Sequence, residues 1–295
     1  MAEGLIAYVR TSTGPERLAR PPFAVVGSLG PLQVGAEMVA CFEELGARSD
    51  RLEHAHALVS RCIGLPNEAP LLKAGRALAR DMDRGIGAGI AAGYHNGRHF
   101  LEVMLTALYL ARLVPLDPRR TARVTTAALI HDFHHDGSRG ASSPFRLELL
   151  AARQALPYLR AARVDDDECL RLEALVLATE AHAGVPFARA CRAHHAAGGP
   201  AMPFTSTLPA PLEQLRVDPQ LALEATLLAE ADVLPSIGLT FEHAEQLQSR
   251  LAIEWGTPMG RDDKLKFIDL MIGKISVAAF FIPSIQALRQ AYLRT

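Results

Sequence analysis

The chain has few cysteines, one tryptophan and no excess of charge of either sign. Its 295 residues include 4 cysteines, 31 basic and 32 acidic side chains, which leaves a formal net charge of −1. The cysteines are scattered and form no Cys-x-x-Cys pair. Four could make two disulfides in a secreted protein, but no other feature suggests secretion, so we expect free, buried thiols in a reducing compartment. The balanced charge gives no general attraction to nucleic-acid backbones or anionic membranes.

Long apolar runs are also missing. No window approaches the roughly 18 uncharged apolar residues that a membrane span requires. The first residues, MAEGLIAYVRTSTG, include the acidic Glu3, and their apolar stretch is too short for a signal peptide. We therefore expect a cytoplasmic protein with neither a membrane nor a nucleic acid as partner.

What the sequence does contain is a helical pattern. Ala, Leu, Arg and Glu dominate, and apolar residues recur every three or four positions, which is typical of amphipathic helices. The clearest stretches are residues 100–114, 120–130, 144–159, 168–179, 219–231 and 262–281. These stretches predict an all-α fold. Proline, glycine and acidic residues separate them.

Three segments are less regular. Residues 23–26 (Phe-Ala-Val-Val) predict a short strand or an extended arm. The acidic run at 165–168 predicts a solvated helix start, where negative charge is favoured by the helix dipole. Residues 183–211 contain three glycines, several prolines and a Ser/Thr cluster, and they predict a long loop of the kind that forms lids or site walls.

Histidine and acidic residues concentrate in four short segments. They are residues 94–99 (Tyr-His-Asn-Gly-Arg-His), 131–137 (His-Asp-Phe-His-His-Asp-Gly), 178–182 (Ala-Thr-Glu-Ala-His) and 229–233 (Ala-Glu-Ala-Asp-Val). Divalent metals prefer neutral imidazoles and ionised carboxylates that converge from separate elements. Because His131 and Asp132 end an apolar helix, their burial would be costly unless they were paired or coordinated to a metal.

The spacing within these segments supports a shared site. His95 and His99 are four residues apart, and His135 lies four residues after His131, so it faces the same way if the helix continues. A single histidine is more often a hydrogen-bonded core residue than a ligand, but the joint pattern with Asp232 is far more specific. His182 could instead end its helix, where a cation is favoured.

The remaining histidines are interpreted as bystanders. His134 is expected to be a neighbour of the site rather than a ligand. The other five are expected at surface or loop positions, where the adjacent pair in the predicted loop could also touch substrate: His54, His56, His194, His195 and His243.

Together the four segments resemble the HD superfamily of metal-dependent phosphohydrolases. Residues 94–99, 131–137 and Asp232 resemble the pattern of the class I cyclic nucleotide phosphodiesterases. The Tyr-His-Asn start, the Ala-Thr-x-x-His segment and Asp232-Val233 followed by Gly238 resemble small bacterial predicted HD phosphohydrolases. The resemblance covers roughly residues 85–240.

This resemblance implies an all-helical, HD/PDEase-like bundle with a binuclear site of Mg, Mn, Zn or Fe between central helices. His99, His131, Asp132 and Asp232 would hold the first metal, and Asp132 would bridge to the second. His135 would hold a metal-bound water, and it and His182 are further candidate ligands. His95 would donate a proton to the leaving oxygen, so that His95, Asp132 and His135 form the catalytic set. We expect residues 81–295 to form the catalytic domain and residues 1–80 a helical extension or cap.

One departure from the phosphodiesterase pattern concerns the base. Those enzymes carry a purine-binding glutamine just before a Phe-Ile pair near the C-terminus, whereas here Lys264 precedes Phe267 and Ile268. Lys264 is expected to be a surface lysine. Arg98, between His95 and His99, could contact phosphate oxygens or face solvent.

These expectations combine into one function and two alternatives. The function is hydrolysis of a small-molecule phosphoester, a nucleotide or cyclic nucleotide, by a metal-activated hydroxide. The first alternative is an HD-type di-iron oxygenase with His135 and His182 on the second metal. The second is a non-catalytic nucleotide-binding sensor. Apolar helices at both ends also make a homodimer plausible.

Overall fold

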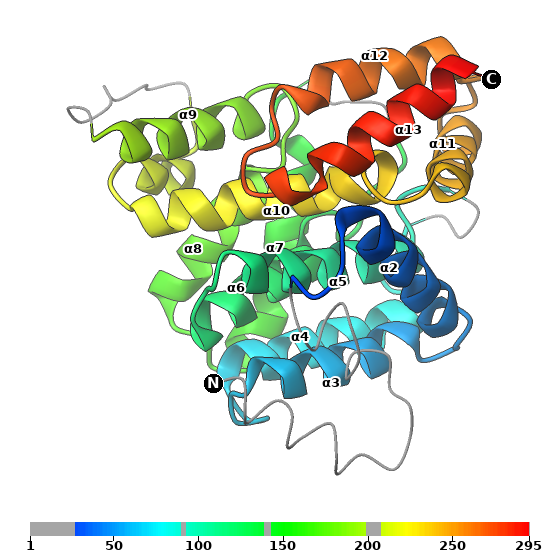
Figure 1. Cartoon of the computed structure of the whole chain (residues 1–295). Helices are drawn as coiled ribbons and strands as arrows, with labels where there is room; N and C mark the ends of the chain where they lie inside the picture. Colours follow the sequence, from blue (N-terminus) through cyan, green and yellow to red (C-terminus); the bar gives the residue numbers. More distant parts are fainter. Residues whose placement is uncertain (1–26, 90–92, 139–142, 199–207, 295) are drawn as a thin grey trace.

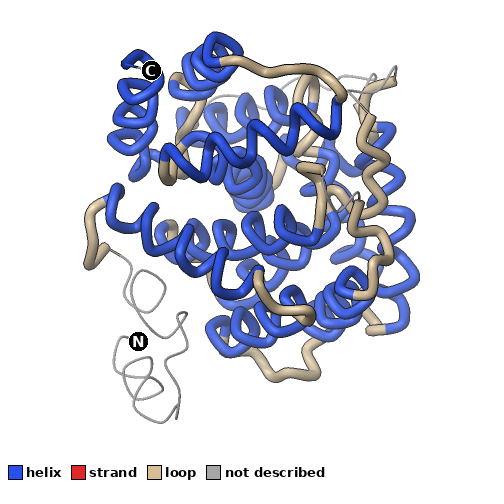
Figure 2. The backbone as a smooth tube through the Cα atoms, turned by 90° about the vertical axis from the view of Figure 1, so that its right-hand side faces the viewer, coloured by secondary structure: helices blue, strands red, loops and turns tan. Residues whose placement is uncertain are grey.

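The computed structural model describes residues 27–89, 93–138, 143–198 and 208–294, and every regular element in these ranges is a helix. Figure 2 shows the same result, with helices joined by loops and no strand in the described part. The all-α prediction is confirmed. The predicted strand or arm at 23–26 lies outside the described residues.

The helices follow one another with short connections. In chain order they are α2 (Pro31–Gly46), α3 (Arg51–Ile63), α4 (Pro70–Asp83), α5 (Gly97–Leu113), α6 (Pro118–Ile130), α7 (Arg146–Ala161), α8 (Asp166–Leu177), α9 (Gly184–Ala197), η2 (Ala210–Arg216), α10 (Pro219–Ile237), α11 (Phe241–Trp255), α12 (Arg261–Ile272), η3 (Ala279–Phe281) and α13 (Ile282–Arg294).

Two helices form the centre of the molecule. Every residue of α5 from His99 to Ala111 is buried, and most of α10 is buried as well. A helix that is apolar on all sides must be covered on all sides. In Figure 1, α10 runs through the middle, with α12 and α13 on one side and α5 and α6 on the other. Helix α5 packs against both α6 and α10, so residues on these three helices face a common interior.

The predicted helical stretches agree with the observed helices except near two glycine- or proline-rich regions. The stretch at 262–281 is not one helix: α12 ends at Ile272, before Gly273, and a separate turn, η3, follows. The long loop predicted at 183–211 is wrong, since α9 and the start of η2 occupy much of it. Alanine-rich sequence outweighs the breakers there. Residues 199–207 lie outside the described ranges.

The first three described helices are part of the same packing. Helix α3 contacts α4 and α5, α4 contacts α6 and α7, and their buried residues join one apolar cluster with those of the central helices. The described part of this region, from residue 27 onward, consists of helices and their connections. The division of the chain near residue 80 stays a prediction.

A buried ionic network ties α6, α8 and α10 together. Arg123 donates to Glu168 and, at 2.7 Å, to Glu224, and Arg120 lies 2.5 Å from the other oxygen of Glu224. The prediction of a solvated helix start is therefore wrong for Glu168, which is 2% exposed, whereas residues 165–167 are exposed. Asp165 does cap α8 by accepting from the backbone N–H of Glu168. The network fixes the relative positions of the helices that carry His131 and Asp232.

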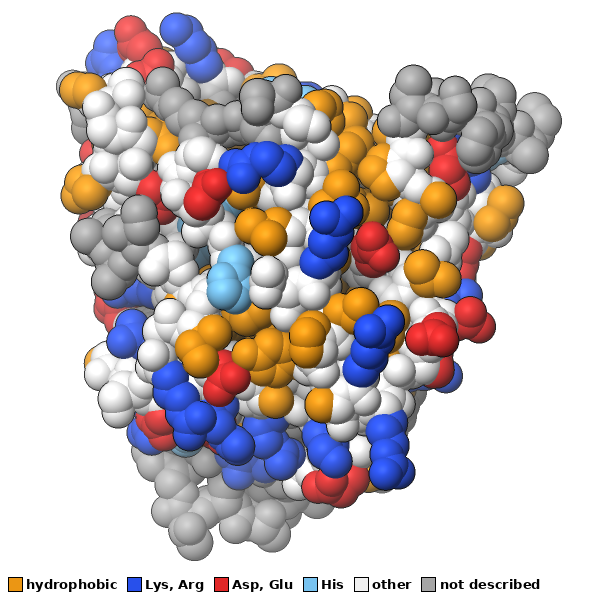
Figure 3. Space-filling view, turned by 180° about the vertical axis from the view of Figure 1, so that it is seen from behind, with side chains coloured by type: hydrophobic (Ala, Val, Ile, Leu, Met, Phe, Trp, Pro, Cys, Tyr) orange, Lys and Arg blue, Asp and Glu red, His pale blue; other side chains and the backbone are white. Residues whose placement is uncertain are grey.

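The outer surface is mixed. On the face seen in Figure 3, apolar, acidic and basic side chains alternate, and Lys and Arg gather along the lower edge, the end of the molecule where α3 and α4 lie. In the described residues no helix combines the length and apolar character needed to cross a bilayer. None of the four cysteines, all of which lie in the described ranges, forms a disulfide, and Cys41 and Cys191 are buried. The net charge is thus near zero, although basic side chains gather at this edge of the molecule (Figure 3).

Candidate metal centre

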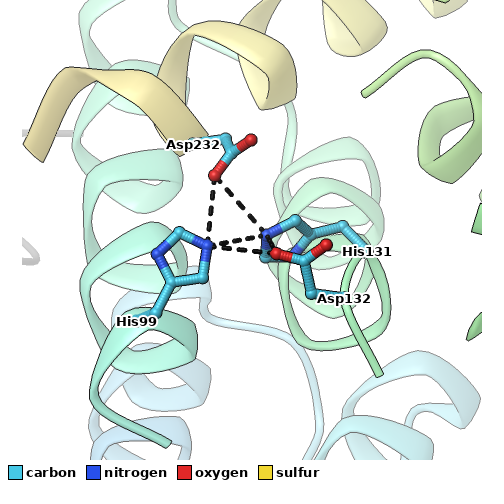
Figure 4. A group of neighbouring side chains, drawn as sticks. All are labelled: His99, His131, Asp132 and Asp232. Carbon is cyan, nitrogen blue, oxygen red and sulfur yellow. Dashed lines mark hydrogen bonds and ion pairs between the residues drawn. The ribbon is translucent and has the colours of Figure 1, made fainter. Parts of the chain in front are cut away.

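Three helices bring four predicted ligands together. His99 lies on the first turn of α5, His131 ends α6 with Asp132 directly after it, and Asp232 projects from α10 (Figure 4). Asn96 caps α5, since its side-chain oxygen accepts from the backbone N–H groups of Arg98 and His99. The cap fixes the direction in which the first turn presents His99.

The donor atoms of these four residues lie within 4.8 Å of one another. The Nε2 of His99 is 3.2 Å from the Nε2 of His131, from an oxygen of Asp132 and from an oxygen of Asp232. The Nε2 of His131 is 3.0 Å from Asp132 and 3.6 Å from Asp232. Donors about 2.1 Å from one ion lie about 3.0 to 3.4 Å apart at coordination angles of about 90° to 109°. The spacing therefore fits the edges of a coordination shell.

Ring orientation agrees with ligation. The Nδ1 of His131 donates its hydrogen to the backbone oxygen of Ala128 at 2.9 Å, so Nε2 is the ring atom that faces the carboxylates. Burial alone would lower the pKa of His99, but hydrogen bonds to Asp132 and Asp232 outweigh it and raise that pKa to about 9. Burial likewise favours neutral Asp132, yet His131 and His95 hold its pKa well below the usual range. The site is a buried set of positive and negative groups, which a divalent ion can organise.

A second group shares one of these residues. His95, Asp132 and His135 also offer donor atoms within 4.8 Å of one another. The rings of His95 and His135 stack at 3.7 Å between centroids, and the Nε2 of His95 is 3.8 Å from Asp132. Asp132 is thus the one residue common to both groups in the described part of the chain.

The prediction that His135 lies one helical turn after His131 is wrong. Helix α6 ends at Ile130, so His131 and His135 do not share a continuous helix, and His95 precedes the cap of α5. A turn follows α6, in which His134 adopts a left-handed φ of 65° and donates its backbone N–H to the backbone oxygen of Gly87. Gly87 itself has a φ of +69°, and a Cβ there would collide with the ring of Phe133. The turn folds His135 back onto His95.

Two acidic residues near the site have no sequence motif that could have revealed them. Glu254, near the end of α11, receives the backbone N–H of His95 at 3.0 Å and lies 2.5 Å from its Nδ1. Glu148 lies on α7 and is half-buried. Burial first, and then the neighbouring carboxylates, raise the pKa of Glu148 to about 7.

Some predicted site residues lie elsewhere. His182 is exposed and belongs to neither group, because it lies in the turn where Glu180 accepts the backbone N–H groups of residues 182–184. His134 belongs to neither group, in keeping with its predicted role as a neighbour. His194 and His195 lie on α9 rather than in a loop, and His195 is 2.8 Å from the backbone oxygen of Leu215.

Three residues that were expected on the surface are buried. His56 is 1% exposed, and His243 is 2% exposed beside Glu102, 3.2 Å away. Lys264 is 5% exposed, with its Nζ 3.5 Å from the backbone oxygen of Ala244, and burial lowers its pKa to about 8. Each of these side chains is covered by a residue of a neighbouring helix: Gly75, Glu102 and Ala244, respectively. The sequence pattern of one helix does not reveal such coverage.

Comparison with known proteins identifies relatives of the fold. The chain resembles LmjPDEB1 in complex with IBMX (16% identity, TM-score 0.59, 86% of this chain and 90% of that one). It also resembles the phosphodiesterase domain of the RhoPDE fusion protein from the choanoflagellate Salpingoeca rosetta, with 20% identity and a TM-score of 0.54 over 89% of this chain and 90% of that one. A further structure of the Salpingoeca rosetta rhodopsin phosphodiesterase domain matches with 19% identity and a TM-score of 0.56, over 100% of this chain and 94% of that one. No protein-family model and no curated protein sequence matches. The chain has a phosphodiesterase-like helical fold.

Proposed function

We propose that this chain is a metal-dependent phosphohydrolase that cleaves a phosphoester of a small molecule, a nucleotide or cyclic nucleotide. The observation that carries the proposal is the position of Asp132 between the other three donors of the first group and the histidines His95 and His135. From this position its carboxylate could bridge an ion in the first group to a second ion beside it, with the two histidines left for proton transfer and for orienting water or phosphate. The likeness to phosphodiesterase domains supports the same reading.

The residues present fit divalent ions. Two imidazoles and two carboxylates, buried and within 4.8 Å of one another, match the ligands preferred by Zn, Mn and Fe, and the carboxylates suit Mg as well. His99, His131, Asp132 and Asp232 would hold the first ion, and Asp132 would bridge to a second. When bound, such ions would polarise the phosphoester and acidify the attacking water.

His95 is positioned to move a proton. Its Nδ1 is held by Glu254, so its Nε2 faces the side of the site where Asp132 lies, 3.8 Å away. In the protonated ring this Nε2–H can be given to the departing oxygen. The carboxylate of Glu254 stabilises the charged ring before the transfer.

His135 suits a role in positioning rather than in ligation. Its Nδ1 accepts the backbone N–H of Gly137 at 3.0 Å, so the neutral ring carries its hydrogen on Nε2. A donating Nε2–H beside Asp132 can orient the attacking water or a phosphate oxygen. Because His182 belongs to neither group, the histidine-rich second site of a di-iron oxygenase has no added support.

The test combines metal analysis with turnover. The purified protein is expected to hold two divalent ions per chain and to hydrolyse at least one phosphoester in a panel with added Mn, Mg or Co. Asp132→Ala should lose both properties. The matched control is Asp136→Ala, because Asp136 lies in the same turn, pairs with Arg146 and belongs to neither ligand group.

Two results would overturn the proposal. One is a metal-loaded protein that hydrolyses no phosphoester but binds nucleotide, which would make the chain a sensor. The other is native iron together with oxygen uptake, which would make it an oxygenase.

A further inference from the structure

A cavity of about 600 Å³ lies beside the metal centre, where the start of α3, the end of α4, the start of α5 and α11 meet. Its lining includes Arg51, Asp83, Asn96, Arg98 and Arg250. None of the residues of the two ligand groups is in this lining. Its volume is within the range that holds a small organic ligand.

The cavity lining carries more positive than negative charge. Three guanidinium groups, from three different helices, face one carboxylate, that of Asp83. This carboxylate is already occupied, because it accepts the backbone N–H groups of Leu52 and Glu53 at 2.9 to 3.1 Å. Asp83 therefore caps α3, and its single negative charge, which also acts on Arg51, leaves the cavity lining with a net positive charge.

The arginines themselves have donors left over. Arg98 uses Nε to bind Glu102 at 3.1 Å, but its Nη2 is buried and has no hydrogen-bond partner in the described residues. Glu102 also serves His243. In the described ranges no hydrogen bond or ion pair links Arg51 or Arg250 to an acceptor. Burial, and then the charge of Arg98, lower the pKa of Arg250, so these two guanidinium groups repel each other.

We propose that this cavity is a binding site for a small phosphate-bearing anion, separate from the metal centre. A group with several oxygens can accept from two or three guanidinium groups at once, which relieves the repulsion between Arg98 and Arg250. The inference does not depend on the proposed hydrolysis. It requires only the cavity and its charge.

The position of the cavity couples it to the neighbouring site. Asn96, in its wall, caps the helix that carries His99 and directly follows His95. Ile253, also in the wall, precedes Glu254, which holds the ring of His95. An anion that bridges Arg98 and Arg250 joins α5 to α11 and so braces the His95–Glu254 pair from outside the metal centre.

The probe for the test is inorganic phosphate, and its binding is measured by calorimetry. Because phosphate can also bind at the metal centre, the measurements use an Asp232→Asn background that weakens that centre. Phosphate binding should persist there, and Arg250→Gln or Arg51→Gln should weaken it by about tenfold or more, as loss of a charge-assisted contact predicts. The matched control is Arg261→Gln, since Arg261 is exposed on α12 and lies outside the cavity lining.

A comparison of thermal unfolding without phosphate shows that each variant is folded. The proposal is overturned if phosphate does not bind in the Asp232→Asn background. It is equally overturned if Arg250→Gln and Arg51→Gln change the affinity no more than Arg261→Gln does.

Discussion

The Nδ1 of His95 lies 2.5 Å from the Oε1 of Glu254, although 159 residues separate them in the chain. The other oxygen of Glu254 accepts the backbone N–H of His95. Both the ring and the backbone of His95 are thus fixed by one carboxylate on α11, so its proton-carrying Nε2 is set by a helix that contributes no ligand to either group.

Glu254→Gln tests this relationship. The amide can still hydrogen-bond His95 but no longer stabilises its charged form, so turnover should fall about 10- to 100-fold with unchanged metal content. Steady-state kinetics and metal analysis measure the two effects. The control is Glu242→Gln, an exposed carboxylate on the same helix. Full turnover in Glu254→Gln would show that His95 does not need its partner.

His182→Ala tests whether His182, a candidate ligand from the sequence, has any role at the metal centre. Because His182 is exposed and outside both ligand groups, the variant should keep its metal and its activity. His99→Ala removes a donor that lies 3.2 Å from three others, and it should lose the first ion and nearly all turnover. Metal stoichiometry after dialysis distinguishes the two. Loss of an ion from His182→Ala would mean that this turn moves into the site.

Arg123→Met tests the buried ionic network. The substitution leaves Glu168 and Glu224 buried without their shared partner, and it should reduce the free energy of unfolding by about 3 to 5 kcal/mol. Chemical denaturation measures the loss. Arg48→Met removes an exposed pair with Asp50 and should leave the midpoint nearly unchanged. A loss under about 1 kcal/mol for Arg123→Met would mean that the network contributes little.

Stability should fall in mild acid because of His56. Burial lowers the pKa of His56 from 6.5 to about 4, so below pH 6.5 the unfolded chain binds a proton that the folded chain excludes. The folded state therefore loses stability between pH 6.5 and 4, by up to about 3 kcal/mol from this group. Denaturation curves across this range should show a shallower pH dependence in His56→Gln than in the parent. Parallel slopes would contradict the prediction.

Local sequence pattern was a good guide to helices and a partial guide to the site. The apolar periodicity of residues 100–114 and 120–130 is strong because these helices are buried, and both were found within three residues of their ends. His99, His131, Asp132 and Asp232 could be singled out because each lies on, or at the end of, such a helix. The turn after α6 could not be foreseen, because it depends on contacts of His134 with Gly87 and of Phe133 with the same glycine.

By itself the sequence determined most of the central helical stretches and which side chains are available as ligands, since both depend on residue type and short spacing. Tertiary packing decided that Glu254 holds His95, that His182 points to solvent, and that Arg51, Arg98 and Arg250 line one cavity. Such partners come from helices far apart in the chain. Their meeting depends on how whole helices cross and pack, which no local pattern encodes.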